Sequence, residues 1–166
     1  MYQSETFVFN SLPTSVDELR AFPEFSLDTP FKGAALALAA LMYYETNPNV
    51  CYDMIDALRG PAPLTVYAKQ FLRDRLGGKM YVVRSFFAGS SPANSYTPTQ
   101  PWTVTVHVNS DAYLTGDRTN VFVQSSGADS PRPIQMRLKP SEGRWYVTEI
   151  QCLSDIRTPA NEDPWA

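Results

Sequence analysis

The stretch that decides the fold runs from Pro30 to Tyr44 and reads PFKGAALALAALMYY. Thr29 suits the N-cap of a helix, and Pro30 suits the first helical position because no amide donor is needed there. The stretch is apolar on almost every side, which predicts a buried helix and not a surface helix. We therefore expect this helix to lie at the centre of the molecule and to end near Asn47-Pro48.

Shorter helices are predicted on both sides of this central one. The segment Ser15–Glu18 matches a capping box, in which each residue bonds the backbone amide of the other. Asn49 is the expected cap of a helix that ends at Gly60. Thr65 is the expected cap of a further helix that ends at Gly77-Gly78. The apolar stripe of that further helix consists of Tyr67, Ala68, Phe71, Leu72 and Leu76.

After the helices the hydrophobic period changes to two, which is typical of strands. In PWTVTVHVN, residues 101–109, the side chains of Trp102, Val104 and Val106 face one way, and those of the threonines and His107 face the other. Further strands are predicted in TFVFN (6–10), MYVVRSFF (80–87), NVFVQ (120–124), IQMRLK (134–139) and RWYVTEIQCL (144–153). We thus expect an α+β fold, with N-terminal helices packed on one face of a C-terminal antiparallel sheet of about four to six strands.

The chain is expected to form one domain over residues 1–166. Its helical part would span about 14–77 and its sheet part about 79–153, followed by an irregular C-terminal tail over 154–166.

The bulk composition excludes several classes of function. The net charge is −3 and basic residues are scattered, so no nucleic-acid partner is expected. The most apolar run, residues 34–44, is shorter than the roughly twenty residues that a bilayer requires, and no secretory signal precedes it, so we expect a cytoplasmic protein without a membrane partner. With two cysteines and His107 as the only histidine, no metal site is expected. The run Gly77-Gly78-Lys79 lacks the spacing of a phosphate-binding loop, and no cofactor is expected.

Two long polar loops, 88–101 and 125–133, are the candidate binding regions, and a meander would place them at one end of the sheet. The candidate ligand or partner contacts are Asn94, Tyr96, Ser126, Asp129 and Arg132. The alternative is structural, because Asp129 and the two prolines of SSGADSPRPI can make the second loop rigid and self-bonded. A serine nucleophile is disfavoured, since the only available base would be His107.

Glu149 on the last predicted strand is a further candidate. It is in phase with Trp145 and Val147, so it would be a buried carboxylate if that side of the strand faces the helices. A charge partner would then be needed, which could be Arg84, Arg137 or Arg157, and Glu149 with Arg84 is the pair that we consider for a pocket. The sequence leaves the burial of Glu149 open.

The motifs FKGAALALAAL, LRGPAPLTVYAKQFLRDRL, SFFAGSSPANSYTPTQPWTVTV and SSGADSPRPIQMRLKPSEGRWYVTE resemble those of a bacterial family of single-domain proteins of unknown function. The likeness covers nearly the whole chain and implies no catalytic residues. A looser likeness of element order is to nuclear-transport-factor-2-like and cystatin-like folds, which often hold a pocket between helices and sheet. Here nearly all strands follow the helices, which departs from the usual order of those folds.

Two functions follow from these observations. The first is a non-enzymatic binding or interaction domain that uses the two polar loops, because no catalytic constellation is recognisable. The alternative is a small-molecule pocket protein, or an enzyme of the cone-shaped α+β type. Its cavity would be lined by Trp102, Tyr81, Phe86 and Trp145. The partner, protein or small molecule, and the oligomeric state are left open.

Overall fold

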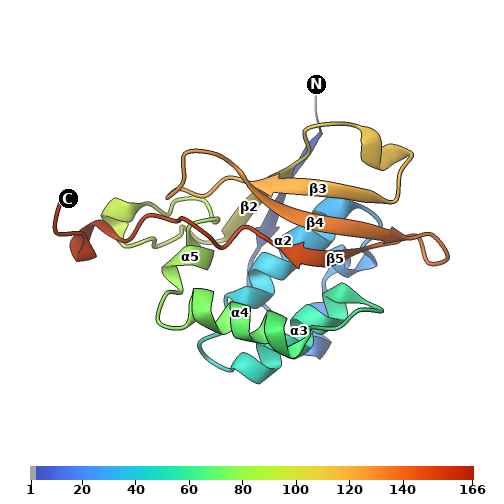
Figure 1. The fold of residues 1–166 in the computed structure, drawn as a ribbon, viewed down its shortest axis with the longest axis horizontal. Helices are drawn as coiled ribbons and strands as arrows, with labels where there is room; N and C mark the ends of the chain where they lie inside the picture. The colour runs from blue at the N-terminus through green and yellow to red at the C-terminus, as the bar shows by residue number, and fades with distance from the viewer. Residues whose placement is uncertain (1–2) are drawn as a thin grey trace.

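A five-stranded antiparallel sheet curls into a half-barrel, and helices pack on it (Figure 1). This computed structural model describes residues 3–166 and confirms the expected α+β class. The strands are β1 (Ser4–Phe9), β2 (Trp102–His107), β3 (Arg118–Val123), β4 (Arg132–Lys139) and β5 (Arg144–Ile150). The α-helices are α1 (Val16–Ala21), α2 (Pro30–Leu41), α3 (Pro48–Arg59), α4 (Val66–Leu76) and α5 (Tyr81–Arg84). The short 3₁₀ helices are η1 (Pro23–Ser26), η2 (Pro92–Asn94), η3 (Ala112–Leu114) and η4 (Ala160–Glu162).

The sheet follows the order β1-β2-β3-β4-β5, and every neighbouring pair is antiparallel. β2 to β5 form a meander, which is the connection that would place the two polar loops at one end of the sheet. β1 comes from the N-terminal end of the chain and pairs with β2 across all the intervening helices, with Phe7 opposite Val104. All five α-helices therefore lie between the first and the second strand in the sequence, although these two strands are neighbours in the sheet.

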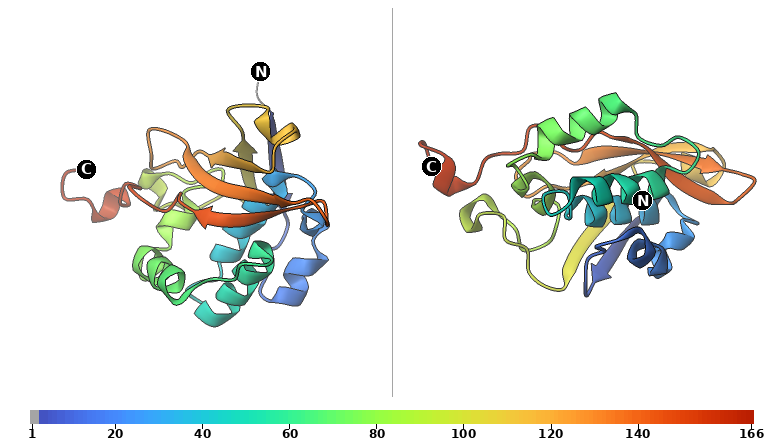
Figure 2. Two further views of the ribbon diagram at one scale, coloured as in Figure 1. Left: turned by 45° about the vertical axis from the view of Figure 1, so that its right-hand side comes forward. Right: turned by 90° about the horizontal axis from the view of Figure 1, so that it is seen from below.

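Helix α2 is the centre of the molecule, as its sequence predicts. All its residues except Lys32 are buried, and it contacts each of the five strands. Gly33 allows close approach to the sheet, because a Cβ there would lie 3.2 Å from the carbonyl oxygen of Trp145. Figures 1 and 2 show α2 running along the concave side of the half-barrel, so helix side chains occupy the space that a cone-shaped fold leaves for a ligand.

The helix caps follow the sequence with two corrections. The Ser15 hydroxyl accepts from the Glu18 amide as expected, but the Glu18 carboxylate accepts from the amide and hydroxyl of Thr14 instead of from Ser15. These bonds hold the pKa of Glu18 below its ordinary value. Helix α3 is capped by Asn47 and not by Asn49, because Pro48 takes the first helical position. Thr65 caps α4 as expected.

The prediction of a strand over residues 80–87 is wrong, because this segment forms α5 and two turns. The Ser85 amide bonds the Tyr81 carbonyl, and the Ser85 hydroxyl bonds the Val82 carbonyl. Both Val82 and Phe86 are buried. A short apolar run that is buried on several sides has no period that separates helix from strand.

The apolar stripe of α4 is only partly used in packing. Leu72 and Leu76 are buried, but Tyr67 is 80% exposed and Phe71 is half-buried. Together with Ala68, these side chains line one wall of a groove of about 450 Å³ whose other wall includes Ile150 of β5.

A β-bulge in β5 decides the position of Glu149. Met136 of β4 lies opposite Val147, whereas Gln135 lies opposite Glu149, so Thr148 is an extra residue. The bulge shifts the alternation, and Glu149 is exposed although Trp145 and Val147 are buried. The conditional hypothesis of a buried carboxylate therefore does not apply.

Candidate functional site

The two predicted loops lie together at one end of the sheet, and the C-terminal tail joins them. The Ser126 amide donates to the Ser85 carbonyl at 2.8 Å, and the Ser126 and Ser90 hydroxyls lie 3.0 Å apart. The Arg157 amide of the tail donates to the carbonyl of Gly127. The tail then continues away from the body of the molecule (Figure 1).

Asn94 holds the first loop in shape. Its Oδ1 accepts from the amides of Ser91 and Thr97, and its Nδ2 donates to the carbonyls of Gly89 and Thr97. Both ends of the side-chain amide are thus used inside the loop, at distances between 2.8 and 3.2 Å.

Tyr96 connects the first loop to the second loop and to the tail. It is fully buried, and its ring stacks on Tyr81 with a centroid distance of 5.6 Å. Its hydroxyl donates to the carbonyl of Arg157 at 2.6 Å. A Cβ on Gly127 would lie 2.2 Å from that hydroxyl, so this glycine leaves the space that the Tyr96 side chain occupies.

Asp129 and Arg132 bind the tail. The exposed Asp129 carboxylate pairs with Arg157 at 2.9 Å. Arg132 donates to the carbonyls of Ser154 and Asp155 and to the hydroxyl of Ser130. Both side chains therefore have intramolecular partners, as the self-bonded alternative expects, and partner binding by these loops stays a prediction.

Ser126 belongs to a cluster of four serines. The Ser125 and Ser85 hydroxyls lie 2.7 Å apart, and the Ser126 hydroxyl donates to the Ser85 carbonyl. The ring of His107 stacks on Phe122 of β3, so its neighbours are strand residues and not these serines. The serine cluster fixes the loop to the end of α5.

Arg84 and Glu149 do not come together. Arg84 donates to the carbonyl of Tyr96, and Glu149 lines the groove beside α4. Within residues 3–166 neither forms an ion pair. The four aromatic residues expected around one cavity are also separated, because Trp145 lies at the opposite end of the sheet from Tyr81 and Phe86.

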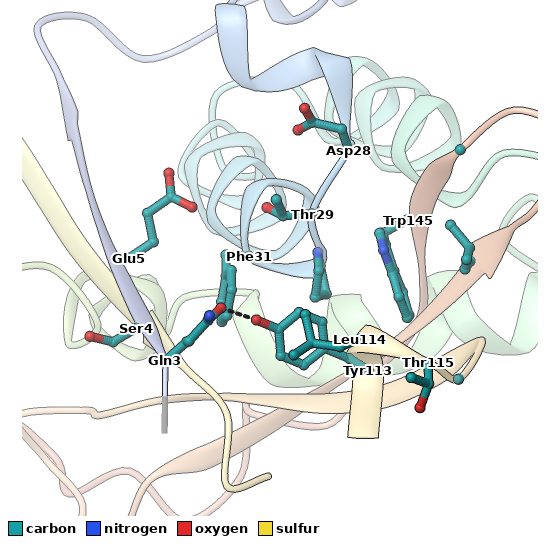
Figure 3. Close-up of a pocket in the computed structure, with 14 residues that line it drawn as sticks. Gln3, Ser4, Glu5, Asp28, Thr29, Phe31, Tyr113, Leu114, Thr115 and Trp145 are labelled. Carbon is teal, nitrogen blue, oxygen red and sulfur yellow. Dashed lines mark hydrogen bonds between the residues drawn. The ribbon is translucent and has the colours of Figure 1, made fainter. Parts of the chain in front are cut away.

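A cleft of about 930 Å³ lies at the other end of the half-barrel (Figure 3). One side is the start of β1, with Gln3 and Glu5. The amino end of α2 forms the back, and η3 and Trp145 of β5 form the far side. The cleft thus opens over the end of the buried central helix.

Three aromatic side chains form its apolar wall. Tyr113 of η3 packs edge to face against Phe31 at 5.7 Å and against Trp145 at 6.5 Å. The Tyr113 hydroxyl donates to the side chain of Gln3, and burial raises its pKa. Because all three rings are held by one another, the wall is rigid.

Two carboxylates lie at the cleft, and they differ in their partners. Asp28 is bonded by the Lys32 ammonium at 2.6 Å, which holds the Asp28 pKa below its ordinary value. Glu5 has no hydrogen bond or ion pair within residues 3–166. It is in phase with Phe7 and Phe9, which point into the core, so its carboxylate is on the concave side of the sheet at the mouth of the half-barrel.

The amino end of α2 contributes backbone amide donors to the same cleft. Thr29 occupies the N-cap position as predicted, but its side chain makes no capping bond, and among the described residues its Oγ1 is the one buried side-chain nitrogen or oxygen without a hydrogen-bond partner. The first amides of this helix therefore lack their usual side-chain acceptor, and the helix dipole places a partial positive charge there.

Glu5, Phe31 and Tyr113 are not among the site residues that the sequence predicts. One signal was present for Glu5, because SETFVF places a carboxylate in the apolar phase of a strand. Tyr113 lies in an irregular connection, and no local pattern indicates that it packs against Trp145.

Three further features of the described residues bear on function: the two thiols, the metal-ligand residue types and the hydrophobicity of the helices. Burial raises the pKa of the Cys51 and Cys152 thiols to about 12, so both stay protonated at neutral pH. In residues 3–166, no three histidine, cysteine or carboxylate side chains gather as a metal site. Over the same residues, no helix combines the length and hydrophobicity that a membrane crossing demands.

Comparisons with curated proteins and with solved structures gave no significant match, so the looser likeness to cone-shaped folds gains no support from them. A comparison with protein families gave a match over residues 11–160, which includes every element from α1 to β5. The chain belongs to the family described as Domain of unknown function (DUF6935).

Proposed function

We propose that this domain binds a small amino compound in the cleft at the amino end of α2. The observation that carries the proposal is Glu5, a carboxylate on the concave side of the sheet for which residues 3–166 provide no partner. The lining includes no lysine or arginine, and the nearby Lys32 ammonium is bonded to Asp28, so a ligand ammonium would be the complement of Glu5.

The other walls define the rest of the ligand. The rings of Phe31, Tyr113 and Trp145 offer an apolar surface beside Glu5, which fits an aromatic or aliphatic body. The uncapped amino end of α2 fits an oxygen acceptor such as a hydroxyl or carboxylate. An amino alcohol or an amino acid combines all three features. This reading favours the small-molecule alternative over the loop-based one, because the polar side chains of the loops already have partners.

The test is isothermal titration calorimetry with three probes that differ only in their polar groups. Phenethylamine carries the ammonium, 3-phenylpropionate carries the carboxylate, and phenylalanine carries both. We expect phenylalanine to bind more tightly than phenethylamine, and 3-phenylpropionate to bind least, because it lacks the ammonium that would pair with Glu5.

The control is a matched pair of variants. Glu5→Gln removes the proposed ammonium partner and should abolish the preference for amines. Asp53→Asn makes the same change of charge at an exposed position on α3 and should leave binding unchanged. Tighter binding of 3-phenylpropionate than of phenethylamine, or equal loss in both variants, would overturn the proposal.

A further inference from the structure

The outer face of the sheet carries two arginines that lie directly opposite each other. Arg118 of β3 pairs with Arg137 of β4, so the two side chains leave the sheet on the same side. Arg137 lies between Met136 and Leu138, which point inward, and both arginines are exposed. Within residues 3–166 neither guanidinium forms a hydrogen bond or an ion pair.

This arrangement is unfavourable unless something compensates it, because like charges directly opposite on neighbouring strands repel. The chain has 17 acidic and 14 basic residues, so acids are not scarce. Two acids on or next to these strands are Asp117, which precedes Arg118, and Glu149, which lies opposite Gln135. Neither pairs with the arginines, so two positive charges remain side by side.

The arginines border a hollow of about 330 Å³ that Gln135 and Thr148 also line. The Thr148 hydroxyl donates to the Gln135 Oε1 at 3.1 Å, which leaves the Gln135 Nε2 as a donor. A neighbouring hollow of about 310 Å³ shares Arg137 and Thr148 and adds Arg59. Arg59 donates to the carbonyls of Thr148 and Ala62, which fixes its guanidinium beside the site.

We propose that Arg118 and Arg137 together bind a phosphate group. Two guanidiniums can each offer a pair of parallel N–H donors to the oxygens of a phosphate, and the bound dianion removes their mutual repulsion. Gln135 supplies a further donor, and Arg59 adds positive charge from the neighbouring hollow. The site lies on the convex face and is separate from the cleft that contains Glu5.

Thermal unfolding of the full chain at pH 7.5 tests this proposal, with inorganic phosphate and phenyl phosphate as probes and sodium chloride at equal ionic strength as the reference. We expect both phosphates to raise the midpoint in a saturable way beyond the effect of chloride. Equal affinity would mean that only the phosphate group is recognised. Tighter binding of phenyl phosphate would place its ring in the neighbouring hollow, beside Tyr146.

Substitution of either arginine should have two separate effects on the unfolding midpoint, one without phosphate and one with it. Without phosphate, Arg118→Gln and Arg137→Gln should each raise the midpoint by about 1–3 °C, because one of two repelling charges is gone. With phosphate, both variants should lose the ligand-dependent shift. Arg75→Gln removes an exposed arginine from α4 and should keep it. A phosphate shift no larger than that of chloride, or a shift that survives in Arg118→Gln, would overturn the proposal.

Discussion

Two threonines stand at the starts of helices and use their hydroxyls differently. Thr65 accepts from the Ala68 amide at 3.0 Å and caps α4. Thr29 has the same place before α2 and also an extended backbone, with φ −132° against −77° at Thr65, but its buried Oγ1 makes no bond. The sequence indicates both as caps, because residue type and position are all that a sequence reports.

Substitution of the two threonines should therefore change the free energy of unfolding in different directions. Thr65→Ala should lower the free energy of unfolding by about 1 kcal/mol, because an amide of α4 loses its acceptor. Thr29→Val keeps the shape and replaces an unbonded buried hydroxyl with a methyl group, so it should be neutral or stabilising. Urea unfolding of both variants measures the difference. An equal loss in both would mean that Thr29 caps its helix in solution.

At the scale of elements, the sequence predicts the helices, caps and strands that have a local residue pattern. It does not predict the features that depend on contacts between distant residues. The central helix, the hydroxyl caps at Ser15 and Thr65 and the strand within 101–109 carry strong local patterns and are confirmed. Two details differ, because α2 ends at Leu41 and not near Asn47, and the Glu18 carboxylate bonds Thr14 and not Ser15. Residues 80–87 lack a distinguishing period and were assigned to the wrong element. The bulge at Thr148 has no sequence mark, and it alone decides that Glu149 is exposed.

The candidate sites show the same division. Loop lengths predict that the segments 88–101 and 125–133 are special, and a meander predicts that they meet. They do meet, but the bonds of Asn94 and Arg132 to backbone carbonyls depend on three-dimensional placement. The cleft around Glu5 joins four distant parts of the chain, so no local motif indicates it.

The close contact between Gly127 of the second loop and Tyr96 of the first loop gives a prediction at the scale of elements. Gly127→Ala should lower the free energy of unfolding by roughly 1–3 kcal/mol, because the new Cβ would lie 2.2 Å from the Tyr96 hydroxyl. In a Tyr96→Phe background the same change should be less damaging, because that oxygen is absent. A double-mutant cycle by urea unfolding measures this coupling. Strictly additive effects would show that the two residues do not share this space.

At the scale of the whole molecule, the two buried thiols link stability to alkaline pH. Their pKa in the folded chain is raised to about 12, whereas an unfolded thiol titrates near 8.5. The folded state therefore keeps protons that the unfolded state releases. The contribution of the protonated thiols to the free energy of unfolding is fully present below about pH 8.5. It is lost progressively as the pH rises toward 12.

We expect the free energy of unfolding to fall between pH 8.5 and 10, by up to about 1.4 kcal/mol per pH unit for each thiol. Urea unfolding across this range measures the slope. The double variant Cys51→Ala, Cys152→Ala should be less stable at neutral pH, because each change removes buried volume, but its profile should be flatter at alkaline pH. Parallel profiles for the two proteins would contradict the assignment.

The central position of α2 has a further consequence, for exchange of backbone hydrogens with deuterated water. Because this helix contacts all five strands and only Lys32 is not buried, no single strand or loop can open enough to expose its amides. Its hydrogen-bonded amides can then exchange only when the entire chain unfolds, so their protection measures global stability. Amides near the exposed Trp165 exchange through local openings. One helix thus reports the stability of the whole domain, residue by residue, without denaturant.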